Sequence, residues 1–149
     1  DLYYMLRAAP EGGEAIARWR QEICNDFAAR MQWTVCPEYA KANHHPVAVI
    51  GRDHTQKMID RKVRAGKEVT LDAGRSYDPD KDRLTFTWEY YREPSTYPGT
   101  VVLDSSEDSV CRLFVPQDAA GCTLPIVLKT DDGTPALTSY RRVVLRVAP

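Results

Sequence analysis

Residues 67–90 read KEVTLDAGRSYDPDKDRLTFTWEY, and this stretch decides the fold class. Its first seven residues place Val69 and Leu71 on one side of an extended chain, because successive strand residues point to opposite faces. Its last seven residues place four apolar side chains on one side in the same way: Leu84, Phe86, Trp88 and Tyr90. The turn Asp78-Pro79-Asp80 lies between them. The stretch therefore predicts two β-strands joined by a turn.

Four further segments have the length and composition of short strands. They are residues 46–50, 110–115, 123–130 and 140–147. Turn residues separate them, and no helical pattern intervenes, so residues 44–149 are predicted to form an immunoglobulin-like antiparallel β-sandwich of about seven strands. In the last strand, Arg141, Arg142 and Arg146 are expected at a solvated or salt-bridged edge.

The chain before residue 44 has a different period. Apolar side chains recur there at steps of three or four residues: Ile16, Trp19, Ile23, Phe27 and Met31. This spacing predicts one face of an α-helix, which Gly12-Gly13 precedes and Pro37 ends. Such a stripe must be buried against another surface, which is either the sandwich or a domain outside this chain.

The balance of charge excludes some partners. The chain has 20 basic and 21 acidic residues, which leaves no net positive charge to attract nucleic acid or an anionic membrane. No apolar run reaches the roughly 20 residues that a membrane span needs. The sequence starts without an initiator Met or a visible signal peptide, so we expect a mature or excised piece of a protein.

The four cysteines leave two possibilities open. Cys24 and Cys36 are close in sequence, as are Cys111 and Cys122, so two local disulfides can be drawn. Free thiols fit the sequence equally well. The absence of a CxxC pair argues against a structural zinc site.

Residues 71–88 and 130–138 resemble the corresponding strands and acidic turns of PKD-like and cadherin-like domains. In that pattern a Trp or Tyr enters the core after the turn, as Trp88 does here. Two departures stand out. Lys81 occupies a position where the turn often has Gly, which suggests a slightly different turn geometry, and the PKD-type WDFGDG segment is absent.

A closer resemblance spans nearly the whole chain. Four segments are similar to bacterial nucleoside-hydrolase-like proteins described as cellulose-binding: residues 25–31, 42–44, 93–99 and 140–143. In that family an α/β domain resembling nucleoside hydrolases precedes an immunoglobulin-like domain. The resemblance implies that residues 1–43 are the tail of the first domain and that residues 44–149 are the second.

The same resemblance implies a function. It suggests a non-catalytic accessory module whose partner is the nucleoside-hydrolase-like domain, which it would dock on and stabilise, in a secreted, periplasmic or cell-surface protein. The alternative is a module that binds cellulose or a related polysaccharide. The catalytic motif of nucleoside hydrolases, DxDxxxDD, is absent from this chain, and no Ser-His order typical of a nucleophile is present. His44 and His45 are expected at the domain junction.

Two groups of residues are candidate binding sites. Asp78, Asp80 and Asp82 either cap their turn through backbone N–H groups or, with Asp131 and Asp132, bind Ca²⁺, the single cofactor that the sequence suggests. An exposed aromatic ring can stack on a sugar, and the candidates for this are Tyr90, Tyr91 and Tyr97. Strand alternation places Tyr90 with Trp88 toward the core and Tyr91 outward, so packing is the competing role.

Overall fold

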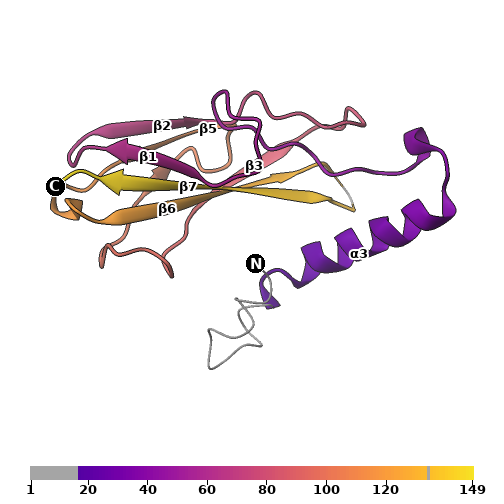
Figure 1. Ribbon diagram of the computed structural model, residues 1–149, viewed down its shortest axis with the longest axis horizontal. Helices are drawn as coiled ribbons and strands as arrows, with labels where there is room; N and C mark the ends of the chain where they lie inside the picture. Colours follow the sequence, from indigo (N-terminus) through magenta and orange to yellow (C-terminus); the bar gives the residue numbers. More distant parts are fainter. Residues whose placement is uncertain (1–16, 134) are drawn as a thin grey trace.

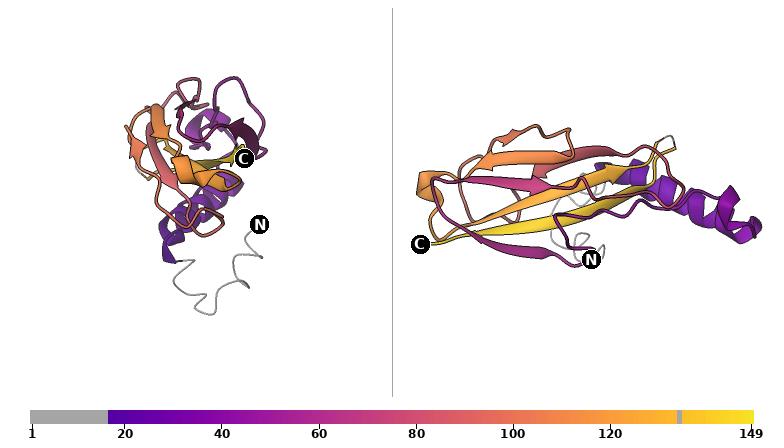
Figure 2. Two further views of the ribbon diagram at one scale, coloured as in Figure 1. Left: turned by 90° about the vertical axis from the view of Figure 1, so that its left-hand side faces the viewer. Right: turned by 90° about the horizontal axis from the view of Figure 1, so that it is seen from above.

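A computed structural model describes residues 17–133 and 135–149, so the predictions for Gly12-Gly13 and Ile16 lie outside the described residues. Seven strands form two facing sheets (Figures 1 and 2). One sheet has the order β1-β7-β6-β3 and the other β2-β5-β4. The strands are β1 (Ile59–Val63), β2 (Glu68–Asp72), β3 (Thr85–Tyr90), β4 (Leu103–Asp104), β5 (Val110–Phe114), β6 (Thr123–Asp131) and β7 (Thr138–Val147). The helices are α3 (Arg20–Val35) and two 3₁₀ turns, η1 (Tyr39–Lys41) and η2 (Gln117–Ala119).

The predicted β-sandwich is confirmed, with two corrections. Residues 46–50 do not form a strand: the backbone makes isolated bridges from Val47 to Tyr77 and from Ile50 to Asp53. Their apolar side chains nevertheless serve the core, since Val49 is fully buried. The sequence pattern missed β1, whose middle residues are charged, because this strand pairs on one side only and leaves them in solvent.

One strand pair departs from the antiparallel pattern. β1 runs parallel to β7, with Ile59 opposite Val143 and Val63 opposite Val147. The other strand pairs are antiparallel, and the longest of these ladders joins β6 to β7. The first sheet is therefore closed by a parallel edge strand that comes early in the chain.

The core lies between the two sheets. Its fully buried side chains come mainly from β2, β5, β6 and β7: Leu71, Cys111, Leu124, Ile126, Leu128, Val143 and Leu145. Trp88 of β3 is 3% exposed and donates a hydrogen bond from Nε1 to the Asp108 carbonyl at 2.9 Å. The prediction that this tryptophan enters the core is therefore confirmed.

Arg141 corrects the expectation of a solvated edge, because it is 3% exposed. Its guanidinium donates to the carbonyl of Lys57 at 2.9 Å and forms an ion pair with Asp53 at 2.9 Å. It therefore fastens the segment before β1 to β7. Arg142 is exposed and Arg146 pairs with Asp60 at 2.6 Å, as an edge position predicts.

α3 lies beyond one end of the sandwich (Figures 1 and 2). It ends at Val35, just before Pro37, as predicted. None of the described helices is long and apolar enough to cross a membrane. All four cysteines are free, with Cys24 exposed and Cys111 buried, so the free-thiol alternative holds in this structure.

Candidate functional site

The helix is fastened to the sandwich by polar contacts. Glu22 pairs with Lys129 of β6 at 2.7 Å, and Asn25 donates a hydrogen bond to the Ala136 carbonyl at 2.8 Å. Just before the helix, Arg18 pairs with Glu89 of β3 at 2.6 Å and with Glu93 at 3.0 Å. These groups hold the side of α3 that faces the β3–β6–β7 end of the sandwich.

His45 joins the same junction. Its Nε2 lies 2.7 Å from Asp26 of the helix and its Nδ1 lies 3.1 Å from the Thr138 carbonyl oxygen. Both neighbours are hydrogen-bond acceptors, so each contact needs an N–H donated by the ring. The hydrogen bond with Arg30 is the main cause that lowers the pKa of Asp26, and that with His45 adds to it. The sequence predicted both histidines at a domain junction; here they lie between α3 and the sandwich, and the division into domains stays a prediction.

Aromatic packing completes the junction. The His44 ring stacks on Tyr39 with centroids 3.6 Å apart, and on Trp33 at 5.7 Å. Trp19 meets Tyr140 of β7 edge to face at 4.9 Å. These contacts and the ion pairs fix the direction in which the helix leaves the sandwich.

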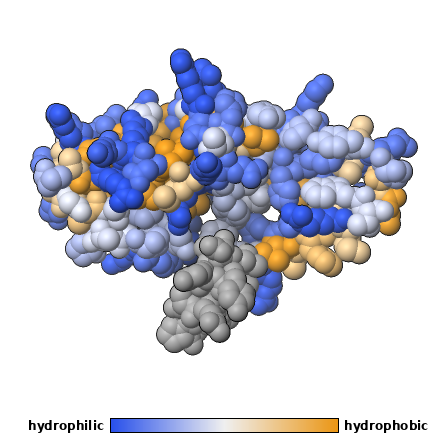
Figure 3. All heavy atoms as spheres, in the orientation of Figure 1, coloured by the Kyte–Doolittle hydropathy of each residue, from blue (hydrophilic) through white to orange (hydrophobic). Residues whose placement is uncertain are grey.

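The apolar stripe of α3 faces away from these contacts. With 3.6 residues per turn, residues 22, 26 and 29 lie on one side of the helix, and 23, 27 and 31 lie mostly on the other. Phe27 is 65% exposed, Met31 53% and Val35 80%, whereas Ala29 is buried. In the space-filling view, hydrophobic side chains gather along α3 at the lower right (Figure 3). Packing on the sandwich, one of the two alternatives, therefore holds for Trp19 at the start of the predicted stripe, whereas Phe27, Met31 and the adjoining Val35 form an exposed stripe.

Burial and neighbouring charges shift the pKa values of the ionisable groups beneath the helix. Desolvation alone would raise the pKa of Glu22, but the hydrogen bond and charge of Lys129 outweigh it and lower that pKa. Desolvation alone would likewise lower the pKa of Lys129. The hydrogen bonds and charges of Glu22 and Asp131 outweigh it and raise that pKa. Burial, followed by the nearby charge of Glu22, raises the pKa of Tyr140. Both members of the ion pair are thus held in their charged forms.

The aspartates of the turn do not converge on one point. Asp78 caps the turn, because its Oδ1 accepts hydrogen bonds from the backbone N–H groups of Asp80 at 2.7 Å and Asp82 at 3.3 Å. Asp80 pairs with His44 at 3.1 Å, and Asp82 is exposed. Within residues 17–133 and 135–149, no three His, Cys, Asp or Glu side chains are grouped so that they could hold a metal ion. The turn-capping role fits this geometry.

The candidate sugar-binding tyrosines do not form a flat exposed row. Tyr97 is 8% exposed and its hydroxyl donates to Asp118 at 2.9 Å. Tyr90 is half-buried and donates to Ser95 at 2.7 Å. Tyr91 is also half-buried, with the Arg18 guanidinium 5.7 Å from its ring centroid. The ring of Tyr97 is thus part of the core, and Tyr91 belongs to the helix junction.

A protein-family model and a solved structure indicate the same family for this chain. Residues 68–147 match the family model described as cellulose-binding protein Sde0182, C-terminal domain. The chain is similar to a nucleoside hydrolase-related hypothetical protein from Saccharophagus degradans that is associated with carbohydrate metabolism, with 40% identity and a TM-score of 0.85 over 87% of this chain. The match covers 32% of that protein, so the chain spans about a third of its length.

Two more distant structures were also found. A PKD domain of human KIAA0319 is 12% identical, with a TM-score of 0.42 over 70% of this chain and 82% of that one. The first two cadherin repeats of human protocadherin-24 are 15% identical, with a TM-score of 0.42 over 70% of this chain and 44% of that one. No curated protein sequence matches the chain.

Proposed function

This chain belongs to the family of the C-terminal domain of cellulose-binding protein Sde0182, and from that premise we propose that it is a non-catalytic accessory domain of a larger nucleoside hydrolase-related protein. In this role it docks on the nucleoside hydrolase-like part through α3 and stabilises it. The observation that carries the proposal is the exposed stripe on the side of α3 that faces away from the sandwich.

The shape of the junction supports docking rather than a free helix. An isolated helix of 16 residues is marginal in water, and an apolar face is normally buried against another surface. Here the polar side of α3 is already engaged by Lys129 and His45, which presents Phe27 and Met31 outward in a fixed direction. About two-thirds of the relative of known structure lies outside the part that this chain matches, and that additional chain provides a surface to receive the stripe.

The test compares two phenylalanines with similar exposure. Phe27 is 65% exposed and Phe114, on β5 of the sandwich, is 57% exposed. In the longer protein, Phe27→Ser should lower the free energy of unfolding by about 2 kcal/mol, the usual cost of removing a large apolar side chain from a buried site. The measurement is urea denaturation of both the longer protein and this chain alone.

Phe114→Ser is the control, and Phe27→Ser in the chain alone should change stability by less than about 0.5 kcal/mol because the side chain is solvated there. Hydrogen exchange gives a second readout: the amides of α3 should exchange more slowly in the longer protein than in this chain. Equal effects of Phe27→Ser in both settings, with equal exchange, would overturn the docking role.

Carbohydrate binding is the second candidate, and the description of the family as cellulose-binding favours it. Tyr91 is the best placed of the three tyrosines for such contact, since Tyr97 is buried. Selective retention of the chain on insoluble cellulose, lost with Tyr91→Ala, would support this candidate. Retention that survives Tyr91→Ala would place any sugar contact elsewhere on the sandwich.

A further inference from the structure

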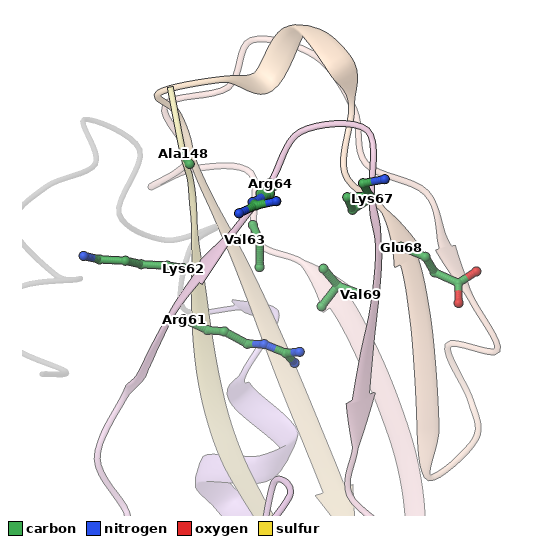
Figure 4. A pocket seen from close by; sticks show the side chains of 8 residues that line it. All are labelled: Arg61, Lys62, Val63, Arg64, Lys67, Glu68, Val69 and Ala148. Carbon is green, nitrogen blue, oxygen red and sulfur yellow. The ribbon is translucent and has the colours of Figure 1, made fainter.

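A groove opens on the side of the sandwich where the edges of the two sheets approach each other. β1 is the edge of one sheet and β2 the edge of the other, and residues 64–67 connect them. The groove has a volume of about 350 Å³, with Val63 and Val69 pointing into it (Figure 4). It lies at the end of the sandwich opposite α3 (Figures 1 and 4).

The lining of this groove is strongly basic although the whole chain has a net charge of −1. Arg61, Arg64 and Lys67 line it as cations, and a fourth, Lys62, belongs to the same wall but points outward from β1, away from the groove (Figure 4). Glu68 is the single acidic residue of the lining, and its carboxylate points outward from β2, away from the groove (Figure 4). None of the four cations forms an ion pair with a carboxylate in the described part of the chain.

Backbone hydrogen bonds fix the turn from which two of these cations project. Gly66 adopts a φ of 69°, and its N–H donates to the Val115 carbonyl at 2.9 Å. This φ lies in the left-handed region that favours glycine, so another residue at this position would strain the turn. The Val115 N–H donates to the Lys67 carbonyl at 2.9 Å, which ties the second side of the turn as well. Arg64 and Lys67 thus flank a rigid turn.

Arg61 spans the groove from the other side. Its Nη1 donates to the Thr70 carbonyl of β2 at 3.0 Å, which fixes the guanidinium between the sheet edges. A guanidinium has five N–H donors, so the remaining ones are available to a ligand. The contact with Thr70 orders the Arg61 guanidinium before binding, and the turn fixes the backbone from which Arg64 and Lys67 project, so the three charges surround an apolar floor.

We propose that this groove binds an acidic saccharide, through carboxylate or sulfate groups on the sugar. Guanidinium groups recognise both of these anions with paired hydrogen bonds. None of the described residues that line the groove is aromatic, so they provide no surface on which a neutral sugar ring or a nucleobase would stack. The inference rests on the carbohydrate-binding candidate above and assigns it a different site and a charged substrate class; it does not depend on docking through α3.

The experiment measures fluorescence anisotropy of labelled oligosaccharides titrated with the full chain. The probes are an oligogalacturonate, a sulfated dextran oligomer and a cello-oligosaccharide of matched length. We expect binding of the carboxylated probe, the sulfated probe or both, and an affinity that falls at least about tenfold between about 50 mM and about 500 mM NaCl because salt screens exposed charges.

Two double variants distinguish binding in the groove from a general effect of positive charge on the surface. Arg64→Ala with Lys67→Ala should weaken binding at least about tenfold, since two charged contacts are lost. The control is Arg75→Ala with Arg83→Ala, which removes the same charge from two exposed arginines outside the groove and should change binding less than about twofold. All four side chains are exposed, so thermal unfolding should be unchanged in both variants.

Four results would overturn the inference. Binding of the cello-oligosaccharide alone would keep the carbohydrate-binding candidate but exclude the acidic groove. Equal losses in the two double variants would show that the groove is not the site. Tighter binding of a single-stranded DNA oligomer than of either acidic sugar would assign the groove to nucleic acid. If no sugar binds, both carbohydrate proposals fail, while the docking role remains to be decided by the Phe27→Ser comparison.

Discussion

Arg141 is a buried charged residue whose contacts hold the segment before β1 against the sandwich. Its guanidinium lies beneath the segment before β1 and contacts three parts of it: the carbonyl of Lys57, the Thr55 hydroxyl at 3.2 Å and the Asp53 carboxylate. A buried guanidinium is stable only when its donors are satisfied, and this segment supplies the acceptors. The segment is therefore held by one side chain rather than by strand pairing.

Replacement of Arg141 by lysine should destabilise the chain. A lysine keeps the charge but cannot form the same set of directed hydrogen bonds, so the free energy of unfolding should fall by about 2 kcal/mol. Arg142→Lys, at the exposed neighbouring position, is the matched control and should change it by less than about 0.5 kcal/mol. Urea denaturation of both variants provides the measurement, and similar values for the two would refute the role of Arg141.

Asp53 gives this contact a defined dependence on pH. Hydrogen bonds from Thr55, and then from Arg141, lower the pKa of Asp53 from 3.8 to about 2. A group with a lowered pKa in the folded state contributes stability above its ordinary pKa, and the contribution is lost as pH falls through the folded value. The difference in unfolding free energy between the natural chain and Asp53→Asn should thus be constant above about pH 5 and shrink between 3.8 and about 2.

Denaturant titrations across this pH range, with both proteins in the same buffers, measure that difference. Asn keeps the size of the side chain, so packing is preserved while the charge is removed. A difference that begins to shrink well above pH 3.8 would mean that Asp53 is not held by these partners.

The helix α3 contributes no residue to the core between the sheets. The buried cluster between the sheets includes residues of all seven strands or their connections but none of α3. Its attachment consists of ion pairs, the contact between Trp19 and Tyr140, and the hydrogen bond of Asn25. Exposed or half-buried contacts of this kind contribute little each, so the sandwich should not depend on the helix for folding.

A shortened chain that begins at His44 should therefore fold as the sandwich. We expect a single cooperative unfolding transition with a free energy lower by about 2 kcal/mol, from the sum of the lost ion pairs and aromatic contacts. The measurement is urea unfolding followed by tryptophan fluorescence, which reports Trp88 in the core. Loss of the cooperative transition would show instead that residues 1–43 and 44–149 form one folding unit.

The elements with regular apolar alternation could be predicted from sequence, and those without it could not. Val69, Leu71 and Trp88 mark β2 and β3 correctly because each strand has one buried face. β1 was not predicted, because its three middle residues are charged and exposed and so show no apolar alternation. Residues 46–50 satisfied the pattern without forming a strand, since a buried apolar segment does not have to be hydrogen-bonded to a sheet.

The candidate site was predicted in part. The helix followed from its periodicity. The change of pattern at residue 44 predicted a domain junction there, and that division stays a prediction, although His45 lies between α3 and the sandwich. The outward direction of the stripe did not, because it depends on tertiary contacts such as Glu22 with Lys129, which are far apart in sequence. The local density of cations at residues 61–67 was a signal available in the sequence, but the near-zero net charge of the chain concealed it.

For the molecule as a whole, the two proposed surfaces lie at opposite ends. α3 and its exposed stripe are at one end, and the basic groove between β1 and β2 is at the other (Figures 1 and 4). Because of this separation, docking of a second domain on α3 leaves the groove accessible. The sandwich then acts as a rigid spacer between a docking face and a binding face.

The parallel pairing of β1 with β7 has a consequence for synthesis on the ribosome. Ile59 faces Val143, a partner 84 positions later in the chain, from 143 minus 59. Since β7 follows the other described strands in sequence, the emerging polypeptide cannot close its larger sheet until Val147 has left the ribosome. Until then, β6 and β1 lack the strand that lies between them, and contacts of such long sequence separation form slowly. The nascent sandwich should therefore need protection from aggregation until β7 has emerged.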